Sequence, residues 1–145
     1  MLTRIFSLAL CFGSAMHAGL LRIELSERSD VLGGKSFGTA GPYERLIGKA
    51  YFAVDPKLPA NRIICDIDKA PRNENGLVEF SSDLYVLKPR DPKNGNGAVI
   101  YEVSNRGRKG MLAMYNRGGS ATDPRTAADL GDNFLLALRT LFLFH

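Results

Sequence analysis

The segment Val78–Gly107 constrains the fold of this chain most, because two strand-like runs flank a loop that can form neither a helix nor a strand. Val78–Leu87 largely alternates apolar and polar residues, which is typical of a strand with one buried face. Ala98–Val103 is a short apolar run whose β-branched and aromatic content favours a strand. The intervening Pro89–Gly97 contains two prolines and two glycines. Local spacing therefore predicts a hairpin, followed by the polar turn Ser104–Gly107.

Further strands are predicted upstream of this segment, so the N-terminal part is expected to be β-rich. They cover Leu20–Ser26, Tyr43–Val54 and Ile63–Ile67, which alternate or are rich in β-branched residues. A bulge is expected at Gly48 in the second of them. A short helix over Tyr43–Lys49 is the alternative.

The sequence changes character after Gly107, where helical patterns replace strand patterns. A helix is predicted to begin within Arg108–Tyr115. A second helix is predicted within Ala121–Leu130, with Thr122 or Asp123 as its N-cap and Pro124 at its first helical position.

The N-terminus has the pattern of a secretory signal. Met1–Ala18 combines a positive Arg4, the apolar run Ile5–Phe12 and small residues beyond it. The run is shorter than the roughly 20 residues that a bilayer-spanning helix needs, so no stable membrane span is predicted. We therefore expect residues 1–18 to be removed and the remainder to be periplasmic or secreted. A buried N-terminal helix is the alternative.

Cysteine count and net charge indicate neither a disulfide nor a nucleic-acid partner. Without the signal, Cys65 is the single remaining cysteine of the two in the chain, so no intrachain disulfide is predicted, and its apolar neighbours indicate a buried side chain. The net charge of +4 does not by itself indicate a nucleic-acid partner. Arg106-Gly107 and Arg117–Gly119 resemble Arg-Gly segments of RNA-binding proteins, but two copies are too few, and no nucleic-acid binding is predicted.

No complete catalytic set is found in the sequence. Gly34–Gly38 matches the G-x-S-x-G nucleophile elbow around Ser36, yet neither a buried strand before it nor a helix after it is indicated. Asp66 and Asp68 do not match a calcium loop, so no metal is predicted, and no cofactor fingerprint is present. His145 is the terminal residue and His17 lies in the signal, so no usable histidine for a triad is predicted, and we assign no catalytic residue.

Three blocks of the sequence carry a resemblance to a known family. Ser36–Pro56, Asp66–Pro89 and Gly97–Gly107 resemble the N-terminal part of a bacterial family of large, often secreted α/β-hydrolase-domain proteins, and the similarity covers about Leu21–Leu136. It implies an α/β class, α/β-hydrolase-like but truncated. In that fold another strand lies between the two strands of Val78–Gly107, and Thr140–Phe144 is the run that could supply it.

The resemblance also implies a role for the turn after Ala98–Val103. In such enzymes this turn supplies one oxyanion-hole N–H, so the backbone N–H groups of Asn105, Arg106 and Gly107 are the candidates. The alternative is a tight turn in which Asn and Gly provide permissive backbone angles.

Two functions follow as expectations. The first is the N-terminal fragment of a secreted or periplasmic hydrolase that acts on a small-molecule ester or related acyl substrate. We expect this chain alone to be inactive, and its apolar C-terminal run, residues 134–145, to lack the partners that would cover it. The second is a small secreted β-rich binding module without enzymatic activity, complete as it stands.

Overall fold

The computed structural model describes residues 19–145, so the predicted signal at residues 1–18 lies outside the described residues. The chain divides into two units. One contains Ala53–Glu79, and the other combines Leu20–Phe52 with Phe80–His145. Within residues 19–145, none of the helices has the length and apolar content needed to cross a bilayer.

Within residues 19–145, five strands form one mixed sheet in the order β1-β2-β3-β5-β4. Their bounds are Gly19–Asp30 for β1, Tyr43–Val54 for β2, Val78–Pro89 for β3, Val99–Glu102 for β4 and Leu141–Phe144 for β5. The bounds predicted for the strand Tyr43–Val54 are confirmed, and the alternative helix over Tyr43–Lys49 is wrong. A Cβ at Gly48 would lie 2.1 Å from the Glu24 carbonyl oxygen, so β1 and β2 approach too closely for any side chain there.

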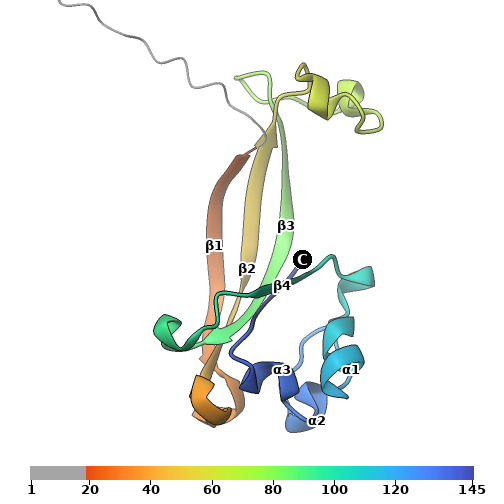
Figure 1. Cartoon of the computed structure of the whole chain (residues 1–145). Helices are drawn as coiled ribbons and strands as arrows, with labels where there is room; N and C mark the ends of the chain where they lie inside the picture. Colours follow the sequence, from red (N-terminus) through yellow and green to blue (C-terminus); the bar gives the residue numbers. More distant parts are fainter. Residues whose placement is uncertain (1–18) are drawn as a thin grey trace, which may run out of the picture. The chain divides into compact units, whose positions relative to one another are not determined.

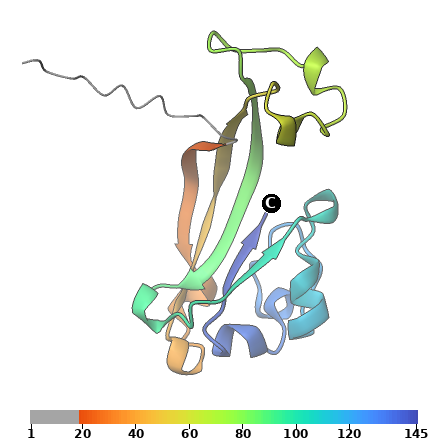
Figure 2. The ribbon, with the colours of Figure 1, turned by 45° about the horizontal axis from the view of Figure 1, so that its top comes forward.

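Strand β5 inserts between β3 and β4 (Figure 2). It runs antiparallel to β3, with Leu143 opposite Val86, and parallel to β4, with Leu143 opposite Tyr101. The local hairpin prediction is therefore wrong, and the inserted C-terminal strand is confirmed. The insertion buries Phe142 and Phe144 almost completely, an apolar gain that a direct pairing of β3 with β4 would lack.

The predicted α/β, α/β-hydrolase-like class is wrong. The sheet is accompanied by three short helices, α1 (Gly110–Asn116), α2 (Ala127–Leu130) and α3 (Phe134–Ala137), of seven, four and four residues. An α/β fold needs helices long enough to cover the sheet between parallel strands. Here residues with positive φ end the helical runs early, among them Arg117 at the end of α1. The domain is a small β-rich mixed sheet.

The three helices lie on one face of the sheet and enclose the core with it (Figure 1). The core residues come from the sheet, the helices and the turns between β1 and β2: Val31, Phe37, Ala40, Tyr43, Tyr85, Leu87, Leu112, Leu130, Leu136, Phe142 and Phe144. The single O–H of Tyr43 is shared between the carbonyl oxygens of Leu136 and Thr140, which lie 3.0 and 2.8 Å from the hydroxyl oxygen. The apolar C-terminal run is thus covered largely by the chain's own sheet and helices, which corrects the expectation that it lacks partners.

Three local predictions also need correction. Ile63–Ile67 is not a strand but a run of turns, because Asp66 adopts a left-handed φ of 56° that breaks an extended conformation. Cys65 is consequently exposed rather than buried. The second helix starts at Ala127 instead of Pro124.

Candidate functional site

A half-open cavity of about 750 Å³ lies within the unit formed by Leu20–Phe52 and Phe80–His145. Four of the five strands, the turn after β4 and the loop before α2 contribute to it. Lining residues include Leu25, Ile47, Tyr85, Lys109, Asp123 and Phe144. A cavity of this size suits a small molecule.

The turn after β4 reaches this cavity. The Ser104 N–H donates to the His145 carbonyl oxygen at 2.7 Å, which continues the pairing of β4 with the chain end. Arg106 and Gly107 then take left-handed φ angles of 55° and 76°, so the turn reverses sharply. Ser104 and Gly107 line the cavity, whereas Asn105 and Arg106 are exposed. The structure thus brings one of the three predicted donor residues, Gly107, to the cavity; the oxyanion role of the three N–H groups stays a prediction.

Ser104 contributes a polar atom that needs a partner. Its Oγ atom is buried and makes no hydrogen bond with any residue that the structure describes. A buried hydroxyl without a hydrogen bond is destabilising, unless a bound molecule or water satisfies it.

Lys109 is a buried cation on the cavity wall, with 9% of its surface exposed. Its Nζ atom donates to the Gly107 carbonyl oxygen at 2.8 Å and lies 4.9 Å from the centroid of the Tyr85 ring. Burial lowers the pKa of the ammonium more than the nearby carboxylates, Asp123 first, raise it. The site thus holds a partly desolvated positive charge.

Tyr85 forms a fixed aromatic wall. Its hydroxyl donates to the Pro124 carbonyl oxygen at 2.9 Å, and its ring packs edge-on against Phe144, with centroids 5.8 Å apart. Burial raises the pKa of the Tyr85 hydroxyl well above its ordinary value. The phenol therefore acts as a neutral donor that ties β3 to the loop before α2.

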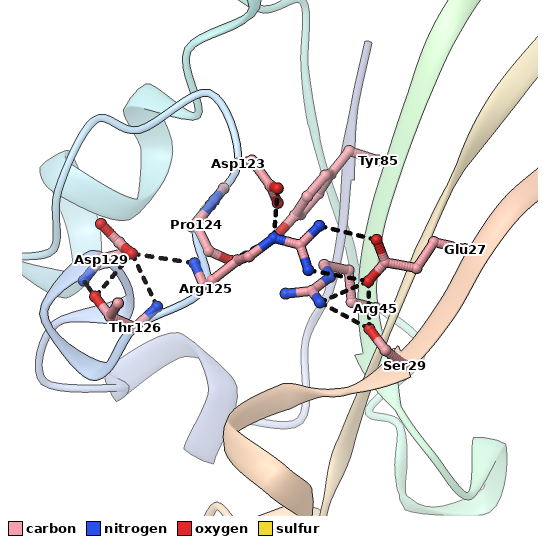
Figure 3. Close-up of polar contacts among 9 residues, drawn as sticks. All are labelled: Glu27, Ser29, Arg45, Tyr85, Asp123, Pro124, Arg125, Thr126 and Asp129. Carbon is pink, nitrogen blue, oxygen red and sulfur yellow. Dashed lines mark hydrogen bonds and ion pairs between the residues drawn. The ribbon is translucent and has the colours of Figure 1, made fainter.

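A network of charges attaches that loop to β1 and β2 (Figure 3). The Arg125 guanidinium donates to both carboxylate oxygens of Glu27, at 3.2 and 2.8 Å, and also to Asp123 at 2.5 Å. Arg45 donates to the same Glu27 carboxylate at 2.7 Å and to Ser29 at 2.8 Å. Hydrogen bonds from Arg125, Ser29 and Arg45, in that order, hold the pKa of Glu27 at about 2.

The same loop is fixed at its other end by a capping box (Figure 3). The Thr126 hydroxyl accepts from the Asp129 N–H, and the Asp129 carboxylate accepts from the Thr126 N–H, at 3.2 and 2.8 Å. This pair, with Thr126 as the N-cap, replaces the predicted cap at Thr122 or Asp123. The wall of the cavity is therefore anchored on both sides.

A serine–histidine contact lies near the cavity. The Ser82 hydroxyl bonds to Nδ1 of His145, and the His145 ring, which stacks on Tyr101, also lines the cavity. In a hydrolase a third group holds such an imidazole in position. No carboxylate of residues 19–145 hydrogen-bonds to His145.

Ser36, in the elbow-like motif, is exposed and is followed by the three-residue 3-10 turn Gly38–Ala40, which is not the helix that an elbow requires.

In the described part of the chain, no group of three or more His, Cys, Asp or Glu side chains converges. Asp66 instead pairs with Lys69 at 2.6 Å.

No family model, no curated protein and no solved structure matches this chain. The interpretation of the cavity therefore rests on its own geometry.

Lys109, Tyr85 and Arg125 are the residues of the site that sequence reasoning missed. Lys109 is one of three basic residues in Arg106–Lys109, and no local pattern distinguishes the buried one from its exposed neighbours. Tyr85 lies in the predicted strand Val78–Leu87, where it alternates with apolar residues. It is buried because β5 pairs with β3 beside it, and this neighbour follows only from the order of the strands in the sheet.

Proposed function

We propose that this chain is a small β-rich module that binds a small amphipathic molecule in the cavity. One observation carries the proposal. The cavity, of about 750 Å³, combines apolar surfaces with a buried, unpartnered Ser104 hydroxyl and a buried Lys109 ammonium. Binding sites for small molecules are typically of this size, mostly apolar and provided with a few polar groups that orient the ligand.

The rigidity of the walls supports this proposal. The Tyr85 hydroxyl bonds to the loop before α2, and Arg125 fixes the same loop to Glu27 on β1. A preformed site avoids much of the entropy cost of ordering side chains on binding.

Binding of a neutral, polarity-sensitive dye such as Nile red tests the proposal. We expect saturable binding with one dye per chain and weaker binding in Thr122→Trp, because Thr122 lines the cavity and the indole would occupy part of it. Thr39→Trp is the matched control, because Thr39 is exposed and outside the cavity lining. Absence of saturable binding, or equal binding by both variants, would contradict the proposal.

Hydrolysis of an ester or related acyl substrate is a second candidate, favoured by the contact of the Ser82 hydroxyl with the His145 imidazole. A hydroxyl beside an imidazole is the pair that acyl transfer uses. Turnover by this chain alone is not expected, because the imidazole lacks an orienting carboxylate among residues 19–145. The periplasmic or secreted location stays a prediction.

A further inference from the structure

The charges around the cavity are almost all paired. Each acidic side chain that lines it forms an ion pair with a basic one. These pairs join Asp83 to Lys49 at 3.3 Å, Asp123 to Arg125 at 2.5 Å and Glu24 to Arg22 at 2.7 Å. Lys109 differs, because no carboxylate of the described chain lies within ion-pairing distance of its ammonium.

The surroundings of Lys109 leave hydrogen-bonding capacity unused. An ammonium has three N–H donors, and one of them is directed at the Gly107 carbonyl oxygen. The Tyr85 ring supplies a further, weaker attraction. A charge that is 9% exposed and lacks an anionic partner is costly, and a ligand anion would offset that cost.

Ser104 provides a second, independent indication at the same cavity. Its buried Oγ atom has no partner in the part of the chain that the structure describes, although a hydroxyl can donate one hydrogen bond. A carboxylate has two oxygen atoms and can accept from an ammonium and a hydroxyl together.

We propose that the cavity selects an amphipathic monocarboxylate, whose carboxylate is bound by the Lys109 ammonium and the Ser104 hydroxyl. The inference rests on the proposed binding function and adds the chemical class of the ligand. The apolar part of the ligand packs against Tyr85 and Phe144, which already contact each other. A single ligand charge fits best, because Lys109 is one cation and Asp123 on the same lining repels a second negative charge.

A series of eight-carbon compounds tests this inference on the unmodified chain. Octanoate, octanol, octylamine and octyl phosphate each compete with bound Nile red. We expect octanoate to bind about tenfold or more tightly than octanol, the effect of one charge-assisted hydrogen bond, and octylamine to bind weakest. If Nile red binds but octanoate binds no more tightly than octanol, the carboxylate assignment is overturned and the proposed binding function stands. Octyl phosphate binding more tightly than octanoate would also overturn it.

Variants locate the carboxylate. Lys109→Met keeps most of the length of the side chain and removes the charge, so we expect the preference for octanoate over octanol, measured against each variant's own affinity for Nile red, to disappear. Ser104→Ala should reduce that preference in part. Lys35→Met is the control, because it removes the same charge from an exposed position outside the cavity lining. A preference that survives in Lys109→Met, or is lost equally in Lys35→Met, would overturn the proposal.

Discussion

The carboxylate of Glu27 accepts two hydrogen bonds from Arg125, which lies 98 positions later in the chain, at 3.2 and 2.8 Å. Arg45 on β2 donates to the same carboxylate at 2.7 Å (Figure 3). One side chain on β1 thus joins two strands to the loop that carries Asp123. Because that loop forms a wall of the cavity, the shape of the cavity depends on the charge of Glu27.

Acid should weaken this connection in a defined pH range. The folded-state pKa of Glu27 is about 2, below its ordinary value of 4.5, so its contribution to the free energy of unfolding is complete above pH 4.5 and is lost as the pH falls towards 2. We expect the urea midpoint of the wild type to fall more steeply over that range than the midpoint of Glu27→Gln, which cannot titrate there. The other carboxylates titrate in both proteins. If the two urea midpoints decline in parallel, the charged form of the Glu27 carboxylate is not stabilised by its hydrogen-bond partners.

The Tyr43 hydroxyl should stabilise the fold more than an exposed tyrosine hydroxyl does. In Tyr43→Phe the buried carbonyl oxygen of Thr140 loses its donor, while that of Leu136 keeps the Arg139 N–H, and the free energy of unfolding should fall by about 1–3 kcal/mol. Tyr51→Phe is the matched control, because the Tyr51 hydroxyl bonds to Glu24 at an exposed position, and its effect should stay within about 0.5 kcal/mol. Urea denaturation measures both. Equal effects would argue against a structural role of the buried hydrogen bond that the Tyr43 hydroxyl shares between the two carbonyl oxygens.

The capping box at α2 predicts the effect of a single hydroxyl. Thr126→Ala removes the acceptor for the Asp129 N–H and should lower the free energy of unfolding by about 1 kcal/mol. Thr39→Ala, at an exposed position with no side-chain cap, should be close to neutral. If the two threonines prove equivalent in urea denaturation, the box does not stabilise this loop.

Local patterns were sufficient to predict the long strands. Tyr43–Val54 was predicted with its observed bounds, because its alternation of apolar and polar residues favours an extended strand. The insertion of β5 came from a family resemblance. A local reading favoured the hairpin, since nothing in Pro89–Gly97 signals that a strand from the far end of the chain will pair with β3.

The predicted fold class was wrong for a different reason. The residues between β4 and β5 have helical composition, but composition does not show where residues with positive φ, such as Arg117 after α1 and Gly131 after α2, will end each helix. Three short helices result instead of a covering layer. Cys65 was misplaced in the same way, because Asp66 with its positive φ turns an apolar run into an exposed loop.

The candidate site was predictable in part. The turn at Ser104–Gly107 was marked by Asn and Gly directly after a strand, and it does reach the cavity. The burial of Lys109 could not be predicted, because it depends on Tyr85 and on a loop fixed by Arg125, all distant in sequence.

The inserted strand should carry much of the stability of the sheet. Phe142 is fully buried between the sheet and the helices, so Phe142→Ala should lower the free energy of unfolding by about 3–5 kcal/mol. Val103→Ala, just after β4 with 69% of its surface exposed, should change it by no more than about 0.5 kcal/mol. Thermal and urea denaturation distinguish the two. A small effect at Phe142 would mean that β5 is not part of the cooperative core.

Finally, the chain should not hydrolyse small esters. The Ser82–His145 contact supplies a hydroxyl and a base, but within residues 19–145 no carboxylate holds the imidazole. A serine–histidine pair that lacks this third group loses most of its rate advantage. We therefore expect p-nitrophenyl acetate to be consumed at the same rate with the wild type, Ser82→Ala and Ser36→Ala, no faster than with denatured protein. Turnover that disappears in Ser82→Ala would show that the dyad is catalytic. Turnover that disappears in Ser36→Ala would instead show that the elbow-like motif is functional despite its exposed position.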